Sequence, residues 1–379
     1  MIIAGETSGD HHGARLVAAM REIDDRLSFF GIGGDAMKRA GVDIVVDAAS
    51  LTVIGITEVF SKIPGILKGA SAIKRAVAER KPGLVILIDF PDFNLHIAKY
   101  VKRFKIPVLY YISPQLWAWR SGRIRTIRQY VDRMAVILPF EKDFYSRHGV
   151  PVSFVGHPIL DNENNDAKAH VVDPKVLPAA GEKIVIGLLP GSRNQEVARN
   201  LPIMLAAADQ INRQSGAAAF VVSVAPGIDP GKIDDYILPY RERLDIRAAE
   251  GEIAALFPRC TLVIAVSGTV TLESAIHGVP MVIVYKVSPV SYMLGRLMIR
   301  VPHIGLANLI AGQRVVPELI QQEATPLNIA RVAREILDDP ARLESIRKKL
   351  LRVRRQLGPS GASRKTAGIA YSMMRKTPS

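Results

Sequence analysis

The sequence contains a single cysteine, Cys260, so it can form no internal disulfide. It has no apolar run of the roughly 18 residues that a transmembrane helix requires. Residues 1–5 include no basic residue and no long apolar stretch, which predicts that there is no signal peptide. These absences favour a soluble protein of a reducing cytoplasm.

Acidic residues are in deficit. Fifty Lys and Arg face 36 Asp and Glu, which gives a formal net charge of +14. Residues 99–133 hold nine basic residues against one acidic, and the segment from Arg331 to the end holds thirteen against four. Such a field suits nucleic acid, anionic lipid or a phosphorylated substrate. On charge alone we favour a basic cytosolic protein without any such partner.

A chain of 379 residues that is 48% hydrophobic exceeds one ordinary core and predicts two α/β domains. Short apolar runs alternate with helical patterns, as in a doubly wound parallel sheet. The polar stretch 161–178 is typical of a linker, and the segment after Pro326 is helical and basic. We predict strands at 1–4, 84–88, 108–112, 134–138 and 153–155, and after the linker at 184–189, 218–224, 262–266 and 281–285.

Each half opens with a strand, a glycine-containing turn and a helix, and such turns can hold an anion at the helix N-terminus. The first turn contains Gly5 and Glu6, and it suits a ligand loop or an ordinary capped turn. Its strand is short, which predicts a natural start a few residues upstream. Asp89 directly follows the strand at 84–88, where a carboxylate in a cleft can act as a base. For Asp92 we favour a turn or helix N-cap after Pro91.

Residues 110–120 hold both tryptophans of the chain beside Arg120, Arg123 and Arg125. This mixture suits a sugar or acyl surface bordered by phosphate contacts, a nucleic-acid surface, or a packed helix with a solvated basic face.

The second half has two further turns of this kind. Gly191 permits a tight bend, Ser192 could cap the following helix, and Arg193 could grip phosphate oxygens or remain a surface arginine. Residues Ser267, Gly268 and Thr269 follow the strand at 262–266 and could hold a pyrophosphate on backbone N–H groups. Glu273 could accept bonds from ribose hydroxyls or compensate the helix dipole.

These segments resemble the lipid-A-disaccharide synthase family over nearly the whole chain, in order. The motifs are AGETSGD (4–10), IDFPDFN (88–94), SPQLWAWR (113–120), LPFEK (138–142), LPGSR (189–193), SGTVTLE (267–273) and ANLIAG (307–312).

The resemblance implies a GT-B fold, in which two Rossmann-like domains face a central cleft and the last helices cross back to the N-terminal domain. The implied domains are 1–162 for the acceptor and membrane, 163–340 for the UDP-sugar, and 341–379 for the returning helices. It implies an inverting transferase without metal or cofactor. Such an enzyme joins UDP-2,3-diacylglucosamine to 2,3-diacylglucosamine 1-phosphate (lipid X) through a β-1,6 bond and releases UDP.

By the family pattern, Asp89 matches the candidate base, Glu6 belongs to the N-terminal cleft loop, and Asn308 lies in the catalytic region. The implied donor-binding residues are Gly191, Ser192, Arg193, Ser267, Gly268, Thr269 and Glu273. Some members are domain-swapped dimers, so a homodimer is one expectation. Two alternatives are enzymes: another GT-B transferase, such as one that acts on a lipid-linked peptidoglycan precursor, or a UDP-sugar epimerase. The third alternative is a nucleic-acid-binding protein, but the sequence has no RRM, KH or helix-turn-helix signature.

Lipid substrates require a surface that meets the membrane. The residues Val59, Phe60, Ile63, Ile66 and Leu67 have near-helical spacing, with Lys62, Lys68, Lys74 and Arg75 around them. We expect this segment to dock peripherally on anionic lipid at the inner face of the inner membrane, with a helix that starts near Ser61 because of Pro64. An amphipathic segment facing the core fits the same pattern.

Overall fold

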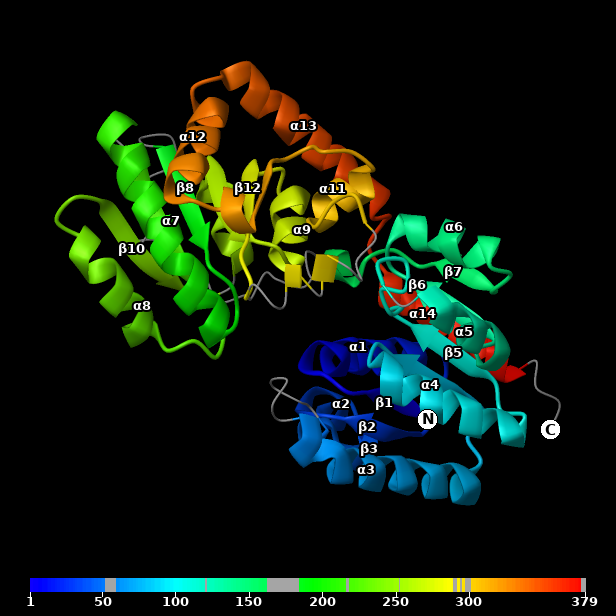
Figure 1. Cartoon of the computed structure of the whole chain (residues 1–379). Coiled ribbons are helices and arrows are strands. Elements are labelled where there is room, and N and C mark those ends of the chain that lie inside the picture. Colours follow the sequence, from blue (N-terminus) through cyan, green and yellow to red (C-terminus); the bar gives the residue numbers. More distant parts are fainter. Residues whose placement is uncertain are drawn as a thin grey trace. The chain divides into compact units, whose positions relative to one another are not determined.

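The computed structural model describes residues 1–51, 59–119, 121–161, 184–215, 218–251, 253–288, 292–293, 295–296 and 301–375, without the side chains at 59–63, 121 and 215. The chain forms two compact units (Figure 1). Unit 1 comprises Met1–Asn164 and Leu357–Ser379, and unit 2 comprises Asn165–Gln356. The chain therefore returns to its first unit at Leu357 rather than at residue 341.

Unit 1 is built on a seven-stranded parallel sheet of order β3-β2-β1-β4-β5-β6-β7. Its strands are β1 (Ile2–Ala4), β2 (Phe29–Gly33), β3 (Val42–Asp47), β4 (Val85–Ile88), β5 (Val108–Tyr111), β6 (Arg133–Val136) and β7 (Val152–Phe154). Its helices are α1 (Thr7–Ile23), α2 (Asp35–Arg39), α3 (Val59–Arg80), α4 (Pro91–Val101), α5 (Ile124–Tyr130), α6 (Pro139–Arg147) and α14 (Ala362–Arg375), with short 3-10 turns at Ala48–Ser50, Lys102–Phe104, Ser121–Arg123 and Pro158–Asp161.

Two apolar clusters cover the two faces of this sheet. One joins the sheet to α3, α4 and α5 through residues such as Ile73, Ile97 and Ile127. The other joins it to α1 and α14 through residues such as Leu16 and Ala367. Since both faces are covered, the strands are near-continuous apolar runs, as the sequence pattern predicted.

Unit 2 contains a six-stranded parallel sheet of order β10-β9-β8-β11-β12-β13. Its strands are β8 (Ile184–Leu189), β9 (Ala218–Val224), β10 (Asp245–Glu250), β11 (Leu262–Val266), β12 (Met281–Tyr285) and β13 (Glu318–Ile320). Its helices are α7 (Asn194–Ser215), α8 (Pro230–Ile237), α9 (Thr269–Ile276), α11 (Leu306–Ala311), α12 (Pro326–Leu337) and α13 (Pro340–Gln356), with 3-10 turns at Leu238–Tyr240, Ile253–Ala255, Phe257–Arg259 and Gln321–Glu323.

The return of the chain to unit 1 depends on Asp161. Its carboxylate accepts hydrogen bonds from the backbone N–H groups of Gly361, Ala362 and Ser363 at 2.6–3.2 Å, which caps the N-terminus of α14. α14, red in Figure 1, then packs beside α1. Asp161 is therefore an anchor of unit 1 rather than the first residue of a linker, and residues 162–178 lie outside the described residues.

α13 remains with unit 2 because its buried residues Ile346, Leu350 and Val353 form the face that packs on α9 and α11. The helical and basic character predicted after Pro326 is confirmed. The family pattern had assigned 341–379 as a whole to the N-terminal domain, whereas only the part from Leu357 onward belongs to unit 1.

Candidate functional site

The sheet of unit 1 has a topological switch point between β1 and β4. These strands are neighbours, with Ala4 paired to Ile88, but their connections run to opposite edges of the sheet. Glu6 follows β1 and Asp89 follows β4, so both residues lie at the carboxyl ends of adjacent strands. Open α/β sheets bind their ligands at such a point, which makes these two loops the candidate site of unit 1.

The backbone is strained at this point. Asp89 and Phe90 have φ angles of 44° and 48°, in the left-handed region that residues with side chains seldom adopt. The fully buried Asn94 donates its Nδ2 to the carbonyls of Ile88 and Asp89 at 3.1 and 2.6 Å. The Tyr110 hydroxyl also donates to the Asp89 carbonyl, at 2.6 Å. Strain that several buried groups maintain is characteristic of functional sites.

The environment of the Asp89 carboxyl suits a proton acceptor. Burial raises its pKa to about 6, and the negative charge of Glu6 contributes to the rise. A carboxylate with this pKa is ionised at neutral pH and is a stronger base than an ordinary aspartate. Glu6 itself is exposed, at the N-cap position of α1.

Two other acids of the N-terminal motifs have structural roles. Asp10 is buried and accepts hydrogen bonds from the backbone N–H groups of Gly34, Ala36 and Met37 at 2.7–3.0 Å, so it fixes the turn into α2. Asp92 forms an exposed ion pair with Arg123. Asp92 lies in the first turn of α4, whose N-cap is Phe90, so the predicted N-cap role of Asp92 is wrong.

A buried carboxylate organises the tryptophan loop. Glu141, which is 1% exposed, accepts hydrogen bonds from the Ser113 hydroxyl at 2.6 Å, from Trp117 Nε1 at 3.1 Å and from the backbone N–H of Leu138 at 3.0 Å. Burial raises the pKa of Glu141, and these bonds oppose that rise. The motifs at 113–120 and 138–142 therefore form one cluster. Ile112, directly before the first motif, has a positive φ of 60°.

The tryptophan segment is not the packed helix that one of our alternatives predicted. Residues 113–115 have no regular secondary structure and residues 116–118 form a turn. Trp117 packs edge-on against Phe140, and Trp119 is 37% exposed. Arg120 lies outside the described residues.

Unit 2 has an equivalent switch point between β8 and β11, where Leu189 pairs with Ala265. Of the residues that we predicted to bind the donor, Gly191, Ser192, Arg193, Ser267 and Gly268 lie in the loops after these strands, and Thr269 and Glu273 lie in α9. In the first loop, Gly191 has a φ of 118°, and a Cβ there would lie 2.5 Å from Glu196 Oε2. Glu196 accepts from the Ser192 backbone N–H at 3.0 Å and pairs with Arg193 at 3.3 Å.

The side chain of Arg193 is 79% exposed, so its guanidinium is available to a ligand despite the ion pair with Glu196. Its carbonyl accepts the first backbone hydrogen bonds of α7, from Glu196 and Val197. Arg193 therefore occupies the N-cap position that we had considered for Ser192, and the backbone N–H of Ser192 instead bonds to Glu196.

The second loop of unit 2 leads into α9. Gly268 is the N-cap, and the Thr271 hydroxyl donates to its carbonyl at 2.8 Å. The Ser267 hydroxyl donates to the Ile304 carbonyl at 3.2 Å, which links this loop to the segment before α11. Gly268 and Thr269 are exposed, and Glu273 is half-buried one turn further along α9.

Asn308 differs from the other candidates because it is fully buried in α11. Its amide bonds to the backbone of Val315 and Val316 and to the carboxylate of Glu318. Glu318 was missed by sequence reasoning. The available signal was a lone acid in the apolar run from Val315 to Ile320.

The segment predicted to meet the membrane lies in α3, which begins at Val59 rather than near Ser61. Pro64 therefore lies inside the helix, where it removes one intrahelical hydrogen bond. Ile66 packs against the core, whereas Leu67 is 62% exposed. The side chains of Val59, Phe60 and Ile63 lie outside the described residues.

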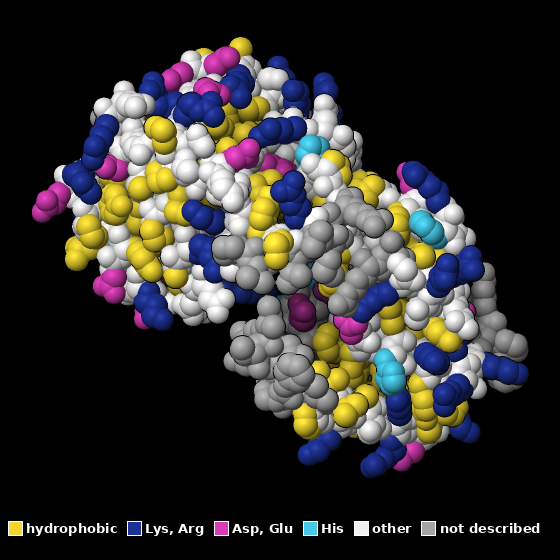
Figure 2. All heavy atoms as spheres, in the orientation of Figure 1, with side chains coloured by type: hydrophobic (Ala, Val, Ile, Leu, Met, Phe, Trp, Pro, Cys, Tyr) yellow, Lys and Arg dark blue, Asp and Glu magenta, His cyan; other side chains and the backbone are white. Residues whose placement is uncertain are grey.

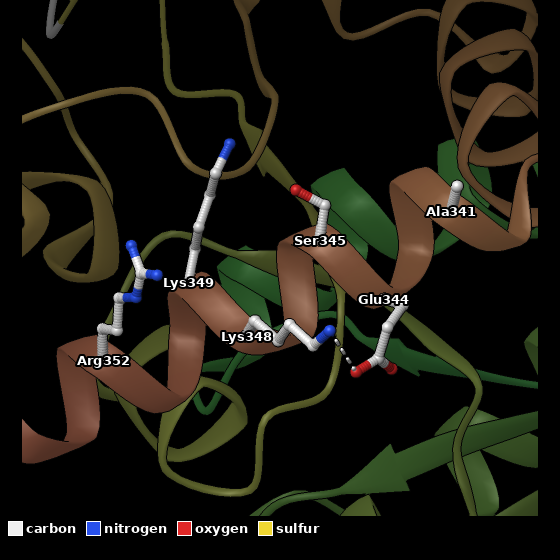
Figure 3. Close-up of a pocket in the computed structure, with 6 residues that line it drawn as sticks. All are labelled: Ala341, Glu344, Ser345, Lys348, Lys349 and Arg352. Carbon is white, nitrogen blue, oxygen red and sulfur yellow. Dashed lines mark ion pairs between the residues drawn. The ribbon is translucent and has the colours of Figure 1, made fainter.

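The basic side chains and the α13 hollow do not mark a second candidate site. Figure 2 shows Lys and Arg side chains spread over this face of both units rather than gathered in one groove. The hollow in Figure 3 is lined by α13 residues, with Lys348 turned towards Glu344 and Lys349 to the other side. It contains none of the residues of the two switch points. Among the described residues, no His, Cys, Asp and Glu cluster suits a metal ion, and no helix is long and apolar enough to cross a membrane.

Comparison with known proteins identifies the family of the chain. A family model described as lipid-A-disaccharide synthetase matches residues 1–372. The chain belongs to the lipid-A-disaccharide synthase family. A lipid-A-disaccharide synthase of Geobacter metallireducens is 45% identical over 382 residues, covering 99% of this chain and 97% of that protein. Its counterpart in Syntrophus aciditrophicus is 44% identical over 378 residues, covering 100% and 98%.

Solved structures with the same fold are more distant. The Staphylococcus aureus protein titled MnaA-UDP co-structure superposes with a TM-score of 0.63 at 13% identity, covering 100% of this chain and 98% of that one. At this identity the likeness shows the GT-B fold alone. The family match therefore decides between transferase and epimerase, and it confirms the predicted family, fold and enzyme class.

Proposed function

We propose that this member of the lipid-A-disaccharide synthase family joins UDP-2,3-diacylglucosamine to lipid X through a β-1,6 bond and releases UDP. Membership of the family supports the lipid A disaccharide reaction. The single observation that carries the mechanism is Asp89, held at the switch point of unit 1 with its pKa raised to about 6. That carboxylate can accept the proton of the acceptor 6-hydroxyl as its oxygen attacks.

In the proposed reaction one bond forms as another breaks. The acceptor oxygen attacks the anomeric carbon of the donor, and the bond from that carbon to the UDP phosphate oxygen breaks with inversion. The acceptor proton passes to Asp89, and the bonding electron pair leaves with UDP. The negative charge of Glu6 raises the proton affinity of Asp89, so Glu6 supports the base electrostatically.

The donor would bind at the switch point of unit 2. Arg193 supplies an exposed guanidinium, and the backbone N–H groups around Gly191, Gly268 and Thr269 can hold the pyrophosphate. Glu273 can accept hydrogen bonds from the ribose hydroxyls. These groups would stabilise the charge that develops on the leaving UDP without a metal ion.

We further propose that the protein meets its substrates at an anionic membrane surface. Both substrates carry acyl chains, and each CH₂ group is worth about 0.8 kcal/mol when it leaves water. The exposed Leu67 in α3, with the exposed Lys68 and Arg75 nearby, offers an apolar and cationic contact for a bilayer. On this view the enzyme acts on the inner face of the inner membrane, and no nucleic acid is a partner.

The decisive experiment is mass spectrometry of products after incubation with the two proposed substrates. A disaccharide 1-phosphate together with UDP is expected. Conversion of UDP-N-acetylglucosamine to its 2-epimer, with no disaccharide, would show an epimerase instead. UDP should also raise the melting temperature, and short oligonucleotides should not compete with it.

A further inference from the structure

Glu318, the first residue of β13, is a buried carboxylate outside both switch-point loops. It is 6% exposed. Its Oε2 accepts from the Ile304 backbone N–H at 3.0 Å, and its Oε1 accepts from the Gly305 N–H at 3.0 Å and from Asn308 Nδ2 at 2.8 Å. Burial of a carboxylate is unfavourable unless such bonds compensate it. The position of the loop at residues 304–305 and the charge of Glu318 therefore depend on each other.

Asn308 completes the arrangement. Its Nδ2 also donates to the Val316 carbonyl at 2.9 Å, and its Oδ1 accepts from the Val315 and Val316 N–H groups at 2.7 and 3.0 Å. A side-chain amide has two donor hydrogens and two acceptor lone pairs, and all four are used. Asn308 therefore has no hydrogen-bonding capacity left for a ligand and acts through its protein partners.

The loop that Glu318 holds touches the donor loop. The Ile304 carbonyl accepts from the Ser267 hydroxyl at 3.2 Å. The adjacent Gly305 is tightly packed, because a Cβ there would lie 2.3 Å from Ile283 Cδ1. A continuous set of contacts thus runs from Asn308 and Glu318 through residues 304–305 to Ser267.

We infer that Glu318 is a positioning residue for the donor loop. With Asn308 it holds residues 304–305 against Ser267, and this sets the backbone of Gly268 and Thr269 for the pyrophosphate of the donor. The inference rests on the proposed function because it assumes that the donor binds unit 2. It gives Asn308 a positioning role rather than contact with the reacting atoms.

Glu318→Gln is the most informative substitution. It keeps the shape of the side chain but replaces one acceptor oxygen with an NH₂ group, which cannot accept from a backbone N–H. We expect UDP affinity, measured by calorimetry, to fall roughly tenfold, as is typical when a bond to a charged group is lost. The KM for the donor should rise, and the KM for the acceptor should change less than about twofold.

Glu141→Gln is the matched control, because Glu141 is also a buried carboxylate that accepts several hydrogen bonds, but it lies in unit 1. It should leave UDP affinity close to that of the unchanged protein. A double-mutant cycle of Glu318→Gln and Ser267→Ala tests the route. If both act through residues 304–305, their effects on UDP affinity are less than additive.

Unchanged UDP affinity in a folded Glu318→Gln protein would overturn the inference, as would strict additivity with Ser267→Ala. If Glu318→Gln does not fold, Gly305→Ala must weaken UDP binding instead, because a Cβ there would lie 2.3 Å from Ile283 Cδ1 and 3.2 Å from Glu318 Oε1 and so displace the same loop. Two further variants, Arg193→Ala and Glu273→Ala, distinguish a failure of the inference about Glu318 from a failure of the proposed donor site. If neither weakens UDP binding, the donor does not bind this switch point; if both do and Glu318→Gln does not, only the inference fails.

Discussion

Gly5 lies directly against the ring of Phe90, and a Cβ atom at Gly5 would be 2.3 Å from Phe90 Cδ1. The turn after β1 and the strained turn after β4 are therefore packed together, although the sequence separates them by more than eighty residues. This contact places the loop of Glu6 beside the backbone that presents Asp89. The geometry of the candidate base thus depends on both turns.

Asp89→Asn should abolish most turnover. A general base typically contributes roughly 10²–10⁴-fold, and an amide cannot accept the proton. Because the pKa of Asp89 in the unliganded protein is raised to about 6, kcat/KM of the unchanged enzyme should rise with pH through that value and level off above it. Steady-state kinetics from pH 5 to pH 8 would check this, with UDP affinity as the control. Near-normal turnover in Asp89→Asn would move the base elsewhere, with Asp92 as the next candidate.

The same substitution should stabilise the fold at high pH. The folded pKa of about 6 lies above the ordinary value of 3.8, so ionised Asp89 destabilises the folded state above pH 6. A shift of this size corresponds to about 3 kcal/mol, of which Asp89→Asn should recover a part. Urea unfolding should show the gain at pH 8 and its loss below pH 4, where Asp89 is protonated in both states. A gain that is independent of pH would contradict the assignment.

Gly5→Ala should impair turnover more than it impairs UDP binding. The added methyl group would displace the Phe90 ring, and with it the backbone of Asp89. Overpacking of this kind costs about 1–3 kcal/mol of stability. Gly83→Ala is the matched control, because a Cβ there meets nothing within 4 Å. Equal kcat values for the two variants would show that the contact between the turns is dispensable.

Activity should survive excess EDTA. Arg193 and the helix N-termini of α7 and α9 are proposed to stabilise the leaving UDP, so no divalent ion is required. The rate should therefore be the same with EDTA and with added magnesium. A loss of activity in EDTA that magnesium restores would require a metal site.

Leu67→Ser and Ile66→Ser form a matched pair for the membrane proposal. Leu67 is 62% exposed, whereas its neighbour Ile66 packs against the core. Leu67→Ser should weaken co-sedimentation with phosphatidylglycerol vesicles severalfold without changing the melting temperature. Ile66→Ser should lower the free energy of unfolding by about 1–3 kcal/mol. If Leu67→Ser binds vesicles normally, the docking surface lies elsewhere, with the basic stretch 99–133 as the next candidate.

Much of the fold could be predicted from local pattern. The strands at 184–189, 218–224, 262–266 and 281–285 match β8, β9, β11 and β12 residue for residue. Prediction failed for β3, β10 and β13, which lie at sheet edges, and for β2. β10 exposes Arg247 and Glu250 and so lacks an apolar run, whereas β2 contains glycines, which weaken the strand signal.

The site shows the same division. The sequence by itself determined the family, the two glycine-containing turns and the candidate residues Asp89, Arg193 and Glu273, because these depend on residue type and local order. Only the tertiary structure decided that Asp161 caps α14, that Glu141 holds the tryptophan loop and that Asn308 is fully engaged by Glu318 and its neighbours. Each of these roles depends on a buried polar group finding partners far along the chain. No local pattern encodes that pairing, because the partners meet only when the apolar strands and helices have packed.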